Sequence, residues 1–465
     1  MKLHDTITAI ATPIGSGGIA ILRLSGSSAE DIAQKLITTK NKKPLCDLES
    51  HKLTLCTVHE AGDCSALIDE ALVAVMRAPH SYTGENVVEI NCHGGFFAAK
   101  KILEELLKAG ARLAEGGEFT RRAFINGKTD LTAAEATMDV IDSHSGLGLQ
   151  NAARSLTGKL AEKINALRDD VIAITSHISA AADYPEEVEA PDEDELTENI
   201  LKIRNSIKAL LRTFDTGRML RDGITTAIIG RPNVGKSSLL NALSGTDRAI
   251  VTDIPGTTRD VIEEYINSGG VALRLLDTAG IRDGAGEVEQ LGIERTKEQI
   301  KGADLCLFLI DSSDELTQED IKIADEILDK NKLIILNKTD KIIKTPKEVV
   351  SEKLRVNPEF IIETATPKGE IPKGIDTLHQ AISKMFLAGN INSGDVYLSN
   401  ARQRDSLLKA FDAICRVLDS INAGMPYDLL YVDLEDTLSA LGEITGVTVQ
   451  EEIIDQVFSR FCVGK

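Results

Sequence analysis

The chain has 465 residues, too many for one hydrophobic core, and at roughly 150 residues per domain its length suggests about three domains. Its 72 acidic and 52 basic residues give a formal net charge of −20, which excludes nucleic-acid binding by bulk electrostatics. RNA must meet a local patch or another subunit. Seven scattered cysteines without a C-x-x-C pair exclude a disulfide framework and a zinc ribbon, and are typical of a reducing cytoplasm. Residues 1–10 do not form a signal peptide, and no apolar run approaches the roughly 18 residues of a membrane span, so we expect a cytoplasmic protein without a membrane segment.

The first part of the chain predicts a mixed α/β domain. Up to about residue 125, short apolar runs at 19–24, 71–75 and 86–91 alternate with glycine-rich turns, which is typical of strands. A helix is predicted over residues 98–109, and Gly110 follows it as a stop signal. We therefore expect an N-terminal α/β domain at residues 1–125.

The rest of the chain predicts helices on both sides of a second α/β domain. Apolar residues recur at helical spacing from about 131 to 215, and again after about 387. Between these segments, apolar strands alternate with helices, the pattern of a parallel, doubly wound sheet. The expected parts are a first helical segment at 126–217, the second α/β domain at 218–385 and a second helical segment at 386–465.

A phosphate-binding loop follows an early strand of the second α/β domain. The apolar strand 226–229 leads into Gly230-Arg-Pro-Asn-Val-Gly-Lys-Ser237, and a helix is expected over 238–244. In such a P-loop, glycines allow a tight turn, and backbone N–H groups bind phosphate at the helix N-terminus. Lys236 is expected to reach the β and γ phosphates, and Ser237 to ligate Mg²⁺. The predicted nucleotide contacts of this loop are Asn233, Val234, Gly235, Lys236, Ser237 and Ser238.

A second motif predicts that the bound base is guanine. The apolar strand 333–336 is followed by Asn337-Lys-Thr-Asp340. The Asp340 carboxylate can accept two hydrogen bonds, from guanine N1–H and from its 2-amino group, which adenine does not supply together. Asn337 and Lys338 are expected to bind the base edge and to brace the P-loop.

Further segments complete the expected GTP site. Residues 277–280 read Asp-Thr-Ala-Gly after an apolar strand, which puts a carboxylate beside the Mg²⁺ shell and a glycine at the γ-phosphate. Residues 256–260 supply a second threonine ligand of the metal, Thr258. Residues 363–366 stand where GTPases usually carry Ser-Ala-Lys, and backbone N–H groups there are expected to bind guanine O6. The predicted contacts in these segments are Thr252, Asp253, Ile254, Pro255, Gly256, Thr257, Thr258, Asp277, Thr278, Ala279, Gly280, Thr364 and Ala365. Four motifs in this order indicate a GTPase.

The residue after the Asp-Thr-Ala-Gly motif indicates an unusual mode of hydrolysis. Small Ras-like GTPases carry a glutamine there that positions the attacking water, whereas this chain has Ile281. The oxygens of Asn233 and of the turn-rich loop 252–257 offer a site for a large monovalent cation, which would do the charge work of an arginine finger. The alternative is that Asn233 only shapes the loop.

Six segments carry a resemblance that covers the chain from about residue 5 to its end. They are residues 11–15, 21–25, 81–85 (Ser-Tyr-Thr-Gly-Glu), 230–238, 250–260 and 461–465 (Phe-Cys-Val-Gly-Lys). Together they resemble the MnmE family of tRNA-modifying GTPases, also called TrmE. The GTPase motifs alone are shared with ribosome-assembly GTPases, and the two chain ends make the match specific.

The resemblance implies a particular architecture and activity. The N-terminal domain would be similar to tetrahydrofolate-binding domains, and a helical domain built from two segments would hold the inserted P-loop GTPase domain. The chain would form a homodimer through its N-terminal domains. Its GTPase domains would dimerise when K⁺ is bound, and the implied K⁺ ligands are Asn233, Thr252, Ile254 and Thr257. With a flavoprotein partner, MnmG, which carries FAD, it would form a heterotetramer. That assembly would install an aminomethyl-type group at carbon 5 of the wobble uridine of certain tRNAs, using a folate one-carbon unit.

The same resemblance implies a folate site. The residues that match the family's site for 5-formyl-tetrahydrofolate, or a related tetrahydrofolate, are Arg23, Glu89, Lys128 and Lys465. Cations suit the glutamate tail of a folate, and a carboxylate suits the N–H donors of its pterin ring.

It also implies catalytic roles for three residues. Glu289 matches the acidic residue credited with holding the attacking water. Arg282 is the alternative, but a guanidinium has only donors and cannot act as a base. Cys462 lies in the terminal motif, either as a nucleophile or as packing at the folate pocket.

Two other classes of function stay open at this point. One is a pure switch, a K⁺-activated GTPase that assists ribosome assembly and modifies no RNA. Such proteins usually carry an added RNA-binding domain with a basic face, whereas the flanking segments here are acidic. The other is a folate-binding interaction protein whose GTPase domain only drives assembly.

Overall fold

The computed structural model describes residues 5–13, 15–246, 264–276, 300–367, 371–387 and 395–465. Its internal contacts form two compact units. Unit 1 comprises residues 1–138, 156–191 and 425–465, and unit 2 comprises residues 139–155 and 192–424. Each unit therefore contains one sheet together with helices from both helical segments of the sequence. Within the described ranges, no helix combines the length and the apolar character that crossing a membrane requires.

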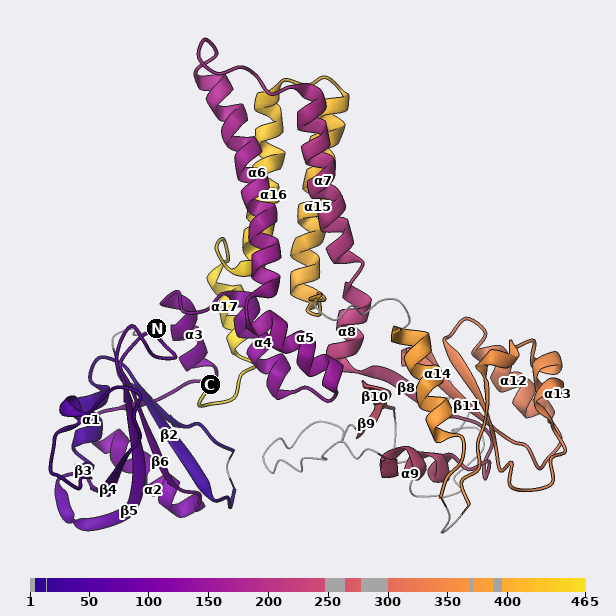
Figure 1. The fold of residues 1–465 in the computed structure, drawn as a ribbon, viewed down its shortest axis with the longest axis horizontal. Helices are drawn as coiled ribbons and strands as arrows, with labels where there is room; N and C mark the ends of the chain where they lie inside the picture. Colours follow the sequence, from indigo (N-terminus) through magenta and orange to yellow (C-terminus); the bar gives the residue numbers. More distant parts are fainter. Residues whose placement is uncertain (1–4, 14, 247–263, 277–299, 368–370, 388–394) are drawn as a thin grey trace. The chain divides into compact units, whose positions relative to one another are not determined.

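Unit 1 is built on a seven-stranded sheet with the order β3-β4-β5-β6-β2-β1-β7. The strands are β1 (Ile7–Ile10), β2 (Ile19–Ser25), β3 (Ile37–Thr39), β4 (Thr54–Glu60), β5 (Asp63–Met76), β6 (Val87–His93) and β7 (Arg112–Leu113). Neighbours are antiparallel except β1 and β7. Helices α1 (Ala29–Gln34) and α2 (Phe96–Lys108) share one core with alternate residues of β2, namely Ala20, Leu22 and Leu24. Figure 1 shows this mixed α/β part in indigo and violet.

A buried arginine fixes helix α3 (Glu118–Ile125) to the rest of this α/β part. Arg122 is 0% exposed, and its guanidinium lies 2.7 Å from Asp5, 3.0 Å from Glu118 and 3.1 Å from Glu85. A hydrogen bond from Arg112 is the main cause that lowers the pKa of Asp5. Burial by itself would raise the pKa of Glu118, but hydrogen bonds from both arginines leave it lowered. Without Arg122 these carboxylates would lose their buried counter-charge, so the network holds three distant parts of the chain together.

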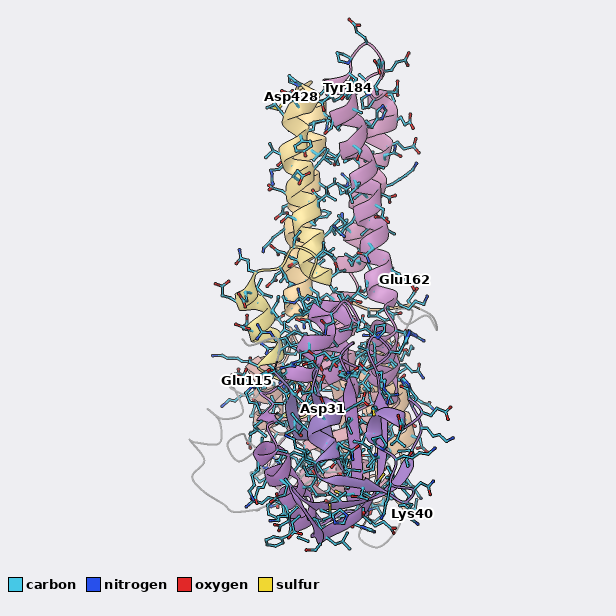
Figure 2. All side chains as sticks on the ribbon, turned by 90° about the vertical axis from the view of Figure 1, so that its left-hand side faces the viewer. Asp31, Lys40, Glu115, Glu162, Tyr184 and Asp428 are labelled. Atoms are coloured by element: carbon cyan, nitrogen blue, oxygen red, sulfur yellow. The ribbon has the colours of Figure 1, made fainter. Side chains whose placement is uncertain are left out.

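The helices of unit 1 pair segments that lie far apart in the sequence. They are α4 (Leu131–Ile141), α6 (Lys159–Asp183), α16 (Tyr427–Thr445) and α17 (Glu451–Phe458). Helix α6 packs against α16. Both helices bury apolar residues at helical spacing, for example Ile164 and Val171 on α6 and Leu434 and Leu441 on α16. The Tyr427 hydroxyl donates to the Pro191 carbonyl at 3.1 Å, so α16 begins beside the loop that follows α6. Figure 2 shows Tyr184 and Asp428 at the same end of these two helices.

The helices of unit 2 repeat this arrangement. They are α5 (Gly146–Leu156), α7 (Glu193–Leu211), α8 (Phe214–Asp222) and α15 (Ala401–Asn422), and α7 packs against α15. The Asn151 side chain bonds both backbone groups of Tyr397, at 2.9 and 3.2 Å. In both units, helices of the first predicted segment therefore pack against helices of the second.

The sheet of unit 2 has six strands in the order β13-β12-β11-β8-β10-β9. They are β8 (Ile224–Ile229), β9 (Glu264–Ser268), β10 (Val271–Leu275), β11 (Leu305–Asp311), β12 (Lys332–Asn337) and β13 (Ile361–Glu363). All neighbours are parallel except β9 and β10. The prediction of a parallel sheet is wrong for this edge strand, because the two-residue turn Gly269–Gly270, with φ of 61° and 93°, can join only antiparallel strands.

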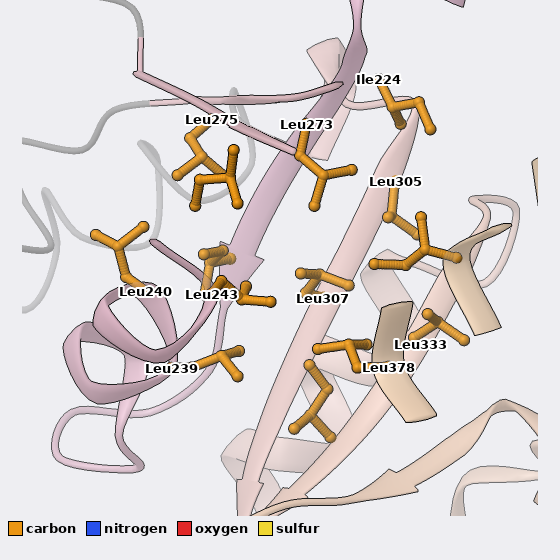
Figure 3. Packing of buried hydrophobic residues seen from close by; sticks show 14 of the residues in the cluster. Ile224, Leu239, Leu240, Leu243, Leu273, Leu275, Leu305, Leu307, Leu333 and Leu378 are labelled. Atoms are coloured by element: carbon orange, nitrogen blue, oxygen red, sulfur yellow. The ribbon is translucent and has the colours of Figure 1, made fainter. Parts of the chain in front are cut away.

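Helices cover both faces of this sheet, as expected for a doubly wound domain. They are α9 (Lys236–Thr246), α12 (Gln318–Glu326), α13 (Lys347–Leu354) and α14 (Ile375–Leu387). Along β11, Leu305, Leu307 and Leu309 join the core that includes α9 and α14, which Figure 3 shows from close by. The alternate residues Cys306 and Phe308 join the core that includes α12 and α13. A strand buried on both faces reads as a continuous apolar run, which is why these strands were visible in the sequence.

Candidate functional site

The P-loop lies between the end of β8 and the start of α9, and two of its positions admit only glycine. Gly230 has a φ of 145°, and a Cβ there would lie 2.5 Å from the Leu309 carbonyl oxygen. Gly235 has a φ of 108°, and a Cβ there would lie 2.1 Å from Asn337 Nδ2. The loop therefore packs closely against the ends of β11 and β12, which a side chain at either glycine would prevent.

Lys236 begins α9 and folds back over the loop. Its Nζ donates to the Gly230 carbonyl at 2.6 Å, and burial lowers its pKa. Ser237 and Ser238 follow in the exposed first turn of the helix. An ammonium group and the N–H groups of a helix N-terminus thus face the same place, the arrangement that binds phosphate.

The Asn337-Lys338 pair connects the end of β12 to the P-loop. Asn337 Nδ2 donates to the Val234 carbonyl at 3.0 Å, and Lys338 Nζ donates to the Asn233 carbonyl at 2.7 Å. Lys338 also binds Asp311 at 2.6 Å. Burial opposes ionisation of Asp311, yet the hydrogen bond from Lys338 leaves its pKa below the ordinary value. The bracing of the loop that the sequence predicted is therefore present.

Asp340 lies two residues beyond this pair and is exposed, in a turn at the carboxyl end of β12. The turn is held by Thr339, whose N–H and hydroxyl both donate to the Thr364 carbonyl, at 3.2 and 3.1 Å. The Asp340 carboxylate is thus on the same strand end as the side chains that brace the P-loop, where a nucleotide base would reach it.

The backbone N–H groups of Thr364 and Ala365, which were expected to bind guanine O6, already form hydrogen bonds within the protein. The Thr364 N–H donates to the Leu336 carbonyl at 2.8 Å, and the Ala365 N–H donates to the Lys373 carbonyl at 3.2 Å. The Thr364 hydroxyl bonds Asn337 Oδ1 at 3.2 Å, so this segment braces Asn337. A base at this place must exchange one of these backbone bonds for its O6.

Many of the predicted nucleotide, K⁺ and catalytic residues lie outside the described residues. These are Thr252, Asp253, Ile254, Pro255, Gly256, Thr257, Thr258, Asp277, Thr278, Ala279, Gly280, Arg282 and Glu289. Among the residues that are described, no group of three His, Cys, Asp or Glu side chains could hold a metal ion. Ser237 is described, whereas the other groups expected around Mg²⁺, Thr258 and Asp277, lie outside the described residues.

Unit 1 brings three of the four predicted folate residues together. Arg23 and Glu89 are direct partners across β2 and β6, and Arg23 Nε donates to the Glu89 carboxylate at 2.8 Å. Arg23 also donates to the Gly464 carbonyl at 3.4 Å, and the Lys465 carbonyl accepts from the Phe119 N–H at 3.1 Å. The C-terminal tail is therefore docked on the N-terminal α/β part, beside the Arg23–Glu89 pair.

Lys128 and Cys462 lie near this cluster without a direct contact to the charged pair. The side chain of Lys128 is exposed, and its stem runs along Gly84. Cys462 is exposed, and its carbonyl accepts from the Gly117 N–H at 3.3 Å. The contacts of Cys462 are thus structural ones made by its backbone.

Sequence reasoning missed Asp311 and Arg122. Asp311 had a local signal, because it ends an apolar strand of a parallel sheet at the edge where ligands bind. Arg122 had none, since its three partners are spread over residues 5 to 118.

A strand, a glycine-rich loop and a helix, closed by an Asn-Lys-x-Asp turn after another parallel strand of the same sheet, define a P-loop GTPase. Two family models match the chain, "GTP-binding protein TrmE N-terminus" over residues 6–128 and "MnmE helical domain" over residues 131–462. The chain belongs to the MnmE family of tRNA modification GTPases, and it is a GTPase that acts in tRNA modification.

Curated relatives match along their whole length. The tRNA modification GTPase MnmE of Bacillus velezensis is 45% identical over 465 residues, covering 99% of this chain and 100% of the relative. Those of Clostridioides difficile and Geobacillus kaustophilus are 43% and 44% identical, each covering 100% of both chains. The solved G domain of the T. maritima FeoB iron transporter covers 35% of this chain at 25% identity, with a TM-score of 0.25 that is too low to support an argument.

We expect guanine selection to depend on Asp340. Asp340→Asn should weaken GTP binding about 10-fold or more, because hydrogen bonds to charged groups contribute about 1.5–3 kcal/mol. The variant should instead accept xanthosine triphosphate, whose base offers a carbonyl where guanine has an amine. Titration calorimetry with both nucleotides measures this. Asp325→Asn, at an exposed position of α12, is the matched control, and normal GTP binding by Asp340→Asn would show that another group reads the base.

Proposed function

We propose that this GTPase works with an MnmG-type flavoprotein, which carries FAD, to install an aminomethyl-type group at carbon 5 of the wobble uridine of certain tRNAs. The one-carbon unit comes from a tetrahydrofolate bound by unit 1. The chain acts in the cytoplasm as a homodimer within a heterotetramer with the flavoprotein. The observation that carries this proposal is the coexistence in one chain of a braced P-loop and a separate cluster of opposite charges formed by Arg23, Glu89 and the C-terminal tail.

The charges of this cluster suit a folate. Arg23 and Glu89 have side chains that are 17% and 22% exposed, so they are partly withdrawn from water yet reachable by a ligand. A carboxylate at this depth can accept the N–H donors of a pterin ring, and the cations of Arg23, Lys128 and Lys465 can bind its glutamate tail. These arguments concern the binding of a folate, and they assign no catalytic role to Cys462, which is part of the tail.

Loss of the protein should change tRNA and leave ribosomes intact. Mass spectrometry of tRNA nucleosides from cells lacking this chain should show the carbon-5 modification of wobble uridine absent. A copy with Lys236→Ala, which removes the phosphate-binding ammonium, should not restore it, whereas the wild-type copy should. Unchanged tRNA together with accumulated ribosomal precursors would favour the alternative of an assembly switch.

The C-terminal tail should be necessary for folate binding. Deleting Cys462–Lys465 removes two hydrogen-bond acceptors, the Gly464 carbonyl that Arg23 binds and the Lys465 carbonyl that accepts from the Phe119 N–H. We expect calorimetric binding of 5-formyl-tetrahydrofolate to be lost while GTP binding in unit 2 stays as in the full chain. Unchanged folate affinity in the truncated protein would rule out a site shared between the chain ends.

The proposed hydrolysis uses K⁺ because no glutamine follows the Asp-Thr-Ala-Gly motif. Asn233 has a φ of 64°, its side chain is exposed, and its carbonyl is held by Lys338, so the P-loop fixes it in one orientation. We place K⁺ at Asn233, Thr252, Ile254 and Thr257, with Mg²⁺ at Ser237 and Thr258. Two GTPase domains dimerise around the K⁺ site, and Glu289 then holds the attacking water.

GTP hydrolysis should be fast in K⁺ and slow in Na⁺, since Na⁺ is too small for the same set of oxygens. Asn233→Ala should remove this difference, and Glu289→Ala should lower turnover roughly 10²-fold or more without weakening GTP binding. Phosphate release measured in the two salts at equal ionic strength decides the matter. Equal rates in both salts, or full activity of Glu289→Ala, would contradict the mechanism.

A further inference from the structure

The segment Ser81–Glu85 in unit 1 turns all its side chains inward except one. Tyr82 is 40% exposed, and the other four residues are buried or half-buried. The Thr83 hydroxyl lies 2.7 Å from that of Ser25, and the Glu85 carboxylate accepts from Ser25 at 2.6 Å. Glu85 is also bound by the buried arginine of α3. The segment is therefore a rigid frame that presents a single aromatic ring.

The ring of Tyr82 is fixed at both ends. Its backbone belongs to this frame, and its hydroxyl lies 2.8 Å from the hydroxyl of Thr120, which is 1% exposed. A ring held in this way loses little conformational freedom when a ligand covers it. Tyr82 thus offers a preformed flat contact surface.

This surface borders the charged pair of the candidate folate site. The guanidinium carbon of Arg23 lies 5.3 Å from the centroid of the Tyr82 ring and 5.7 Å from that of Phe119. Arg23 in turn binds Glu89 at 2.8 Å. Arg23 therefore lies between two features that a ligand could use, the Glu89 carboxylate and the Tyr82 ring.

The other side of the frame borders Lys128. Gly84 has a φ of 77°, and a Cβ there would lie 3.1 Å from Lys128 Cγ. The stem of Lys128 therefore crosses the same turn that presents Tyr82. The frame joins a carboxylate on one side to an exposed cation on the other.

We propose that Tyr82 is a ligand-contact residue that stacks against the flat, nitrogen-rich ring of a heterocyclic ligand whose N–H donors bind Glu89. The cations next to the ring take the anionic tail of the same ligand. This inference rests on the proposed folate site and deepens it, because it assigns a residue to the face of the pterin ring. The Glu89 carboxylate accepts hydrogen bonds from N–H donors, which the pterin ring carries and the carboxylates of the glutamate tail do not. The pterin ring is therefore the part of the ligand that we assign to Tyr82.

The test compares substitutions that keep or remove aromatic character. Tyr82→Phe should bind 5-formyl-tetrahydrofolate nearly as wild type. Tyr82→Leu, which stays apolar but has no aromatic face, should bind roughly 5- to 160-fold more weakly, the range given by stacking on aromatic side chains. Titration calorimetry on the full chain measures both. Tyr431→Leu is the matched control, because Tyr431 is 39% exposed on α16 of the same unit. Thermal unfolding followed by circular dichroism shows that each variant is folded.

A truncated ligand locates the contact. p-Aminobenzoyl-L-glutamate, which lacks the pterin ring, should bind wild type and Tyr82→Leu equally. An equal loss with this fragment would overturn the assignment of Tyr82 to the pterin ring, and wild-type affinity of Tyr82→Leu for the whole folate would overturn the contact. Failure of the wild-type protein to bind 5-formyl-tetrahydrofolate would instead refute the folate site itself, so the two proposals fail by different measurements.

Discussion

The nucleotide site depends on how closely the P-loop packs against the ends of its neighbouring parallel strands. A parallel sheet brings the carboxyl ends of its strands to one edge, and here the backbone at Gly235 comes so near Asn337 that a Cβ would lie 2.1 Å from its amide nitrogen. The contact lets Asn337 and Lys338 bind loop carbonyls directly. The glycines therefore serve the packing of the loop as much as its binding of phosphate, and base recognition and phosphate binding become parts of one rigid edge.

The candidate site of unit 1 is organised differently, because it is a cluster of charged side chains on the face of a sheet. The register of β2 and β6 sets Arg23 directly opposite Glu89 on the face away from the core, where opposite charges across strands stabilise each other. The tail then adds the Gly464 carbonyl as a further acceptor for Arg23. Gly464 can approach this closely because it has a φ of 102°, and a Cβ would lie 2.5 Å from the Ile10 carbonyl oxygen. The site is thus assembled from parts of the chain more than 440 residues apart.

The sequence could predict those features whose pattern lies in one contiguous stretch of residues. The P-loop, the Asn337–Asp340 motif and the strands β8, β10 and β12 are contiguous, so their letters alone were sufficient, and the helix expected at 98–109 is α2. β5 was seen only as its apolar end, because its first half, Asp63 to Glu70, mixes polar and apolar residues and none of them is buried. The Arg122 network and the engaged N–H groups of Thr364 and Ala365 depend on contacts made only by the fold. The antiparallel edge strand β9 was missed because its tight Gly269–Gly270 turn interrupts an otherwise parallel pattern.

In each candidate site, at least one cation is bound by an acceptor of the protein itself. Lys236 donates to Gly230, Lys338 to Asp311, and Arg23 to Glu89. In a chain with a net charge of −20, such pairing keeps local positive potential low, and an anionic ligand at either place would exchange one acceptor for another. Selectivity then rests on geometry, since only a ligand whose anionic groups replace these carbonyls and carboxylates at the same positions recovers the lost bonds.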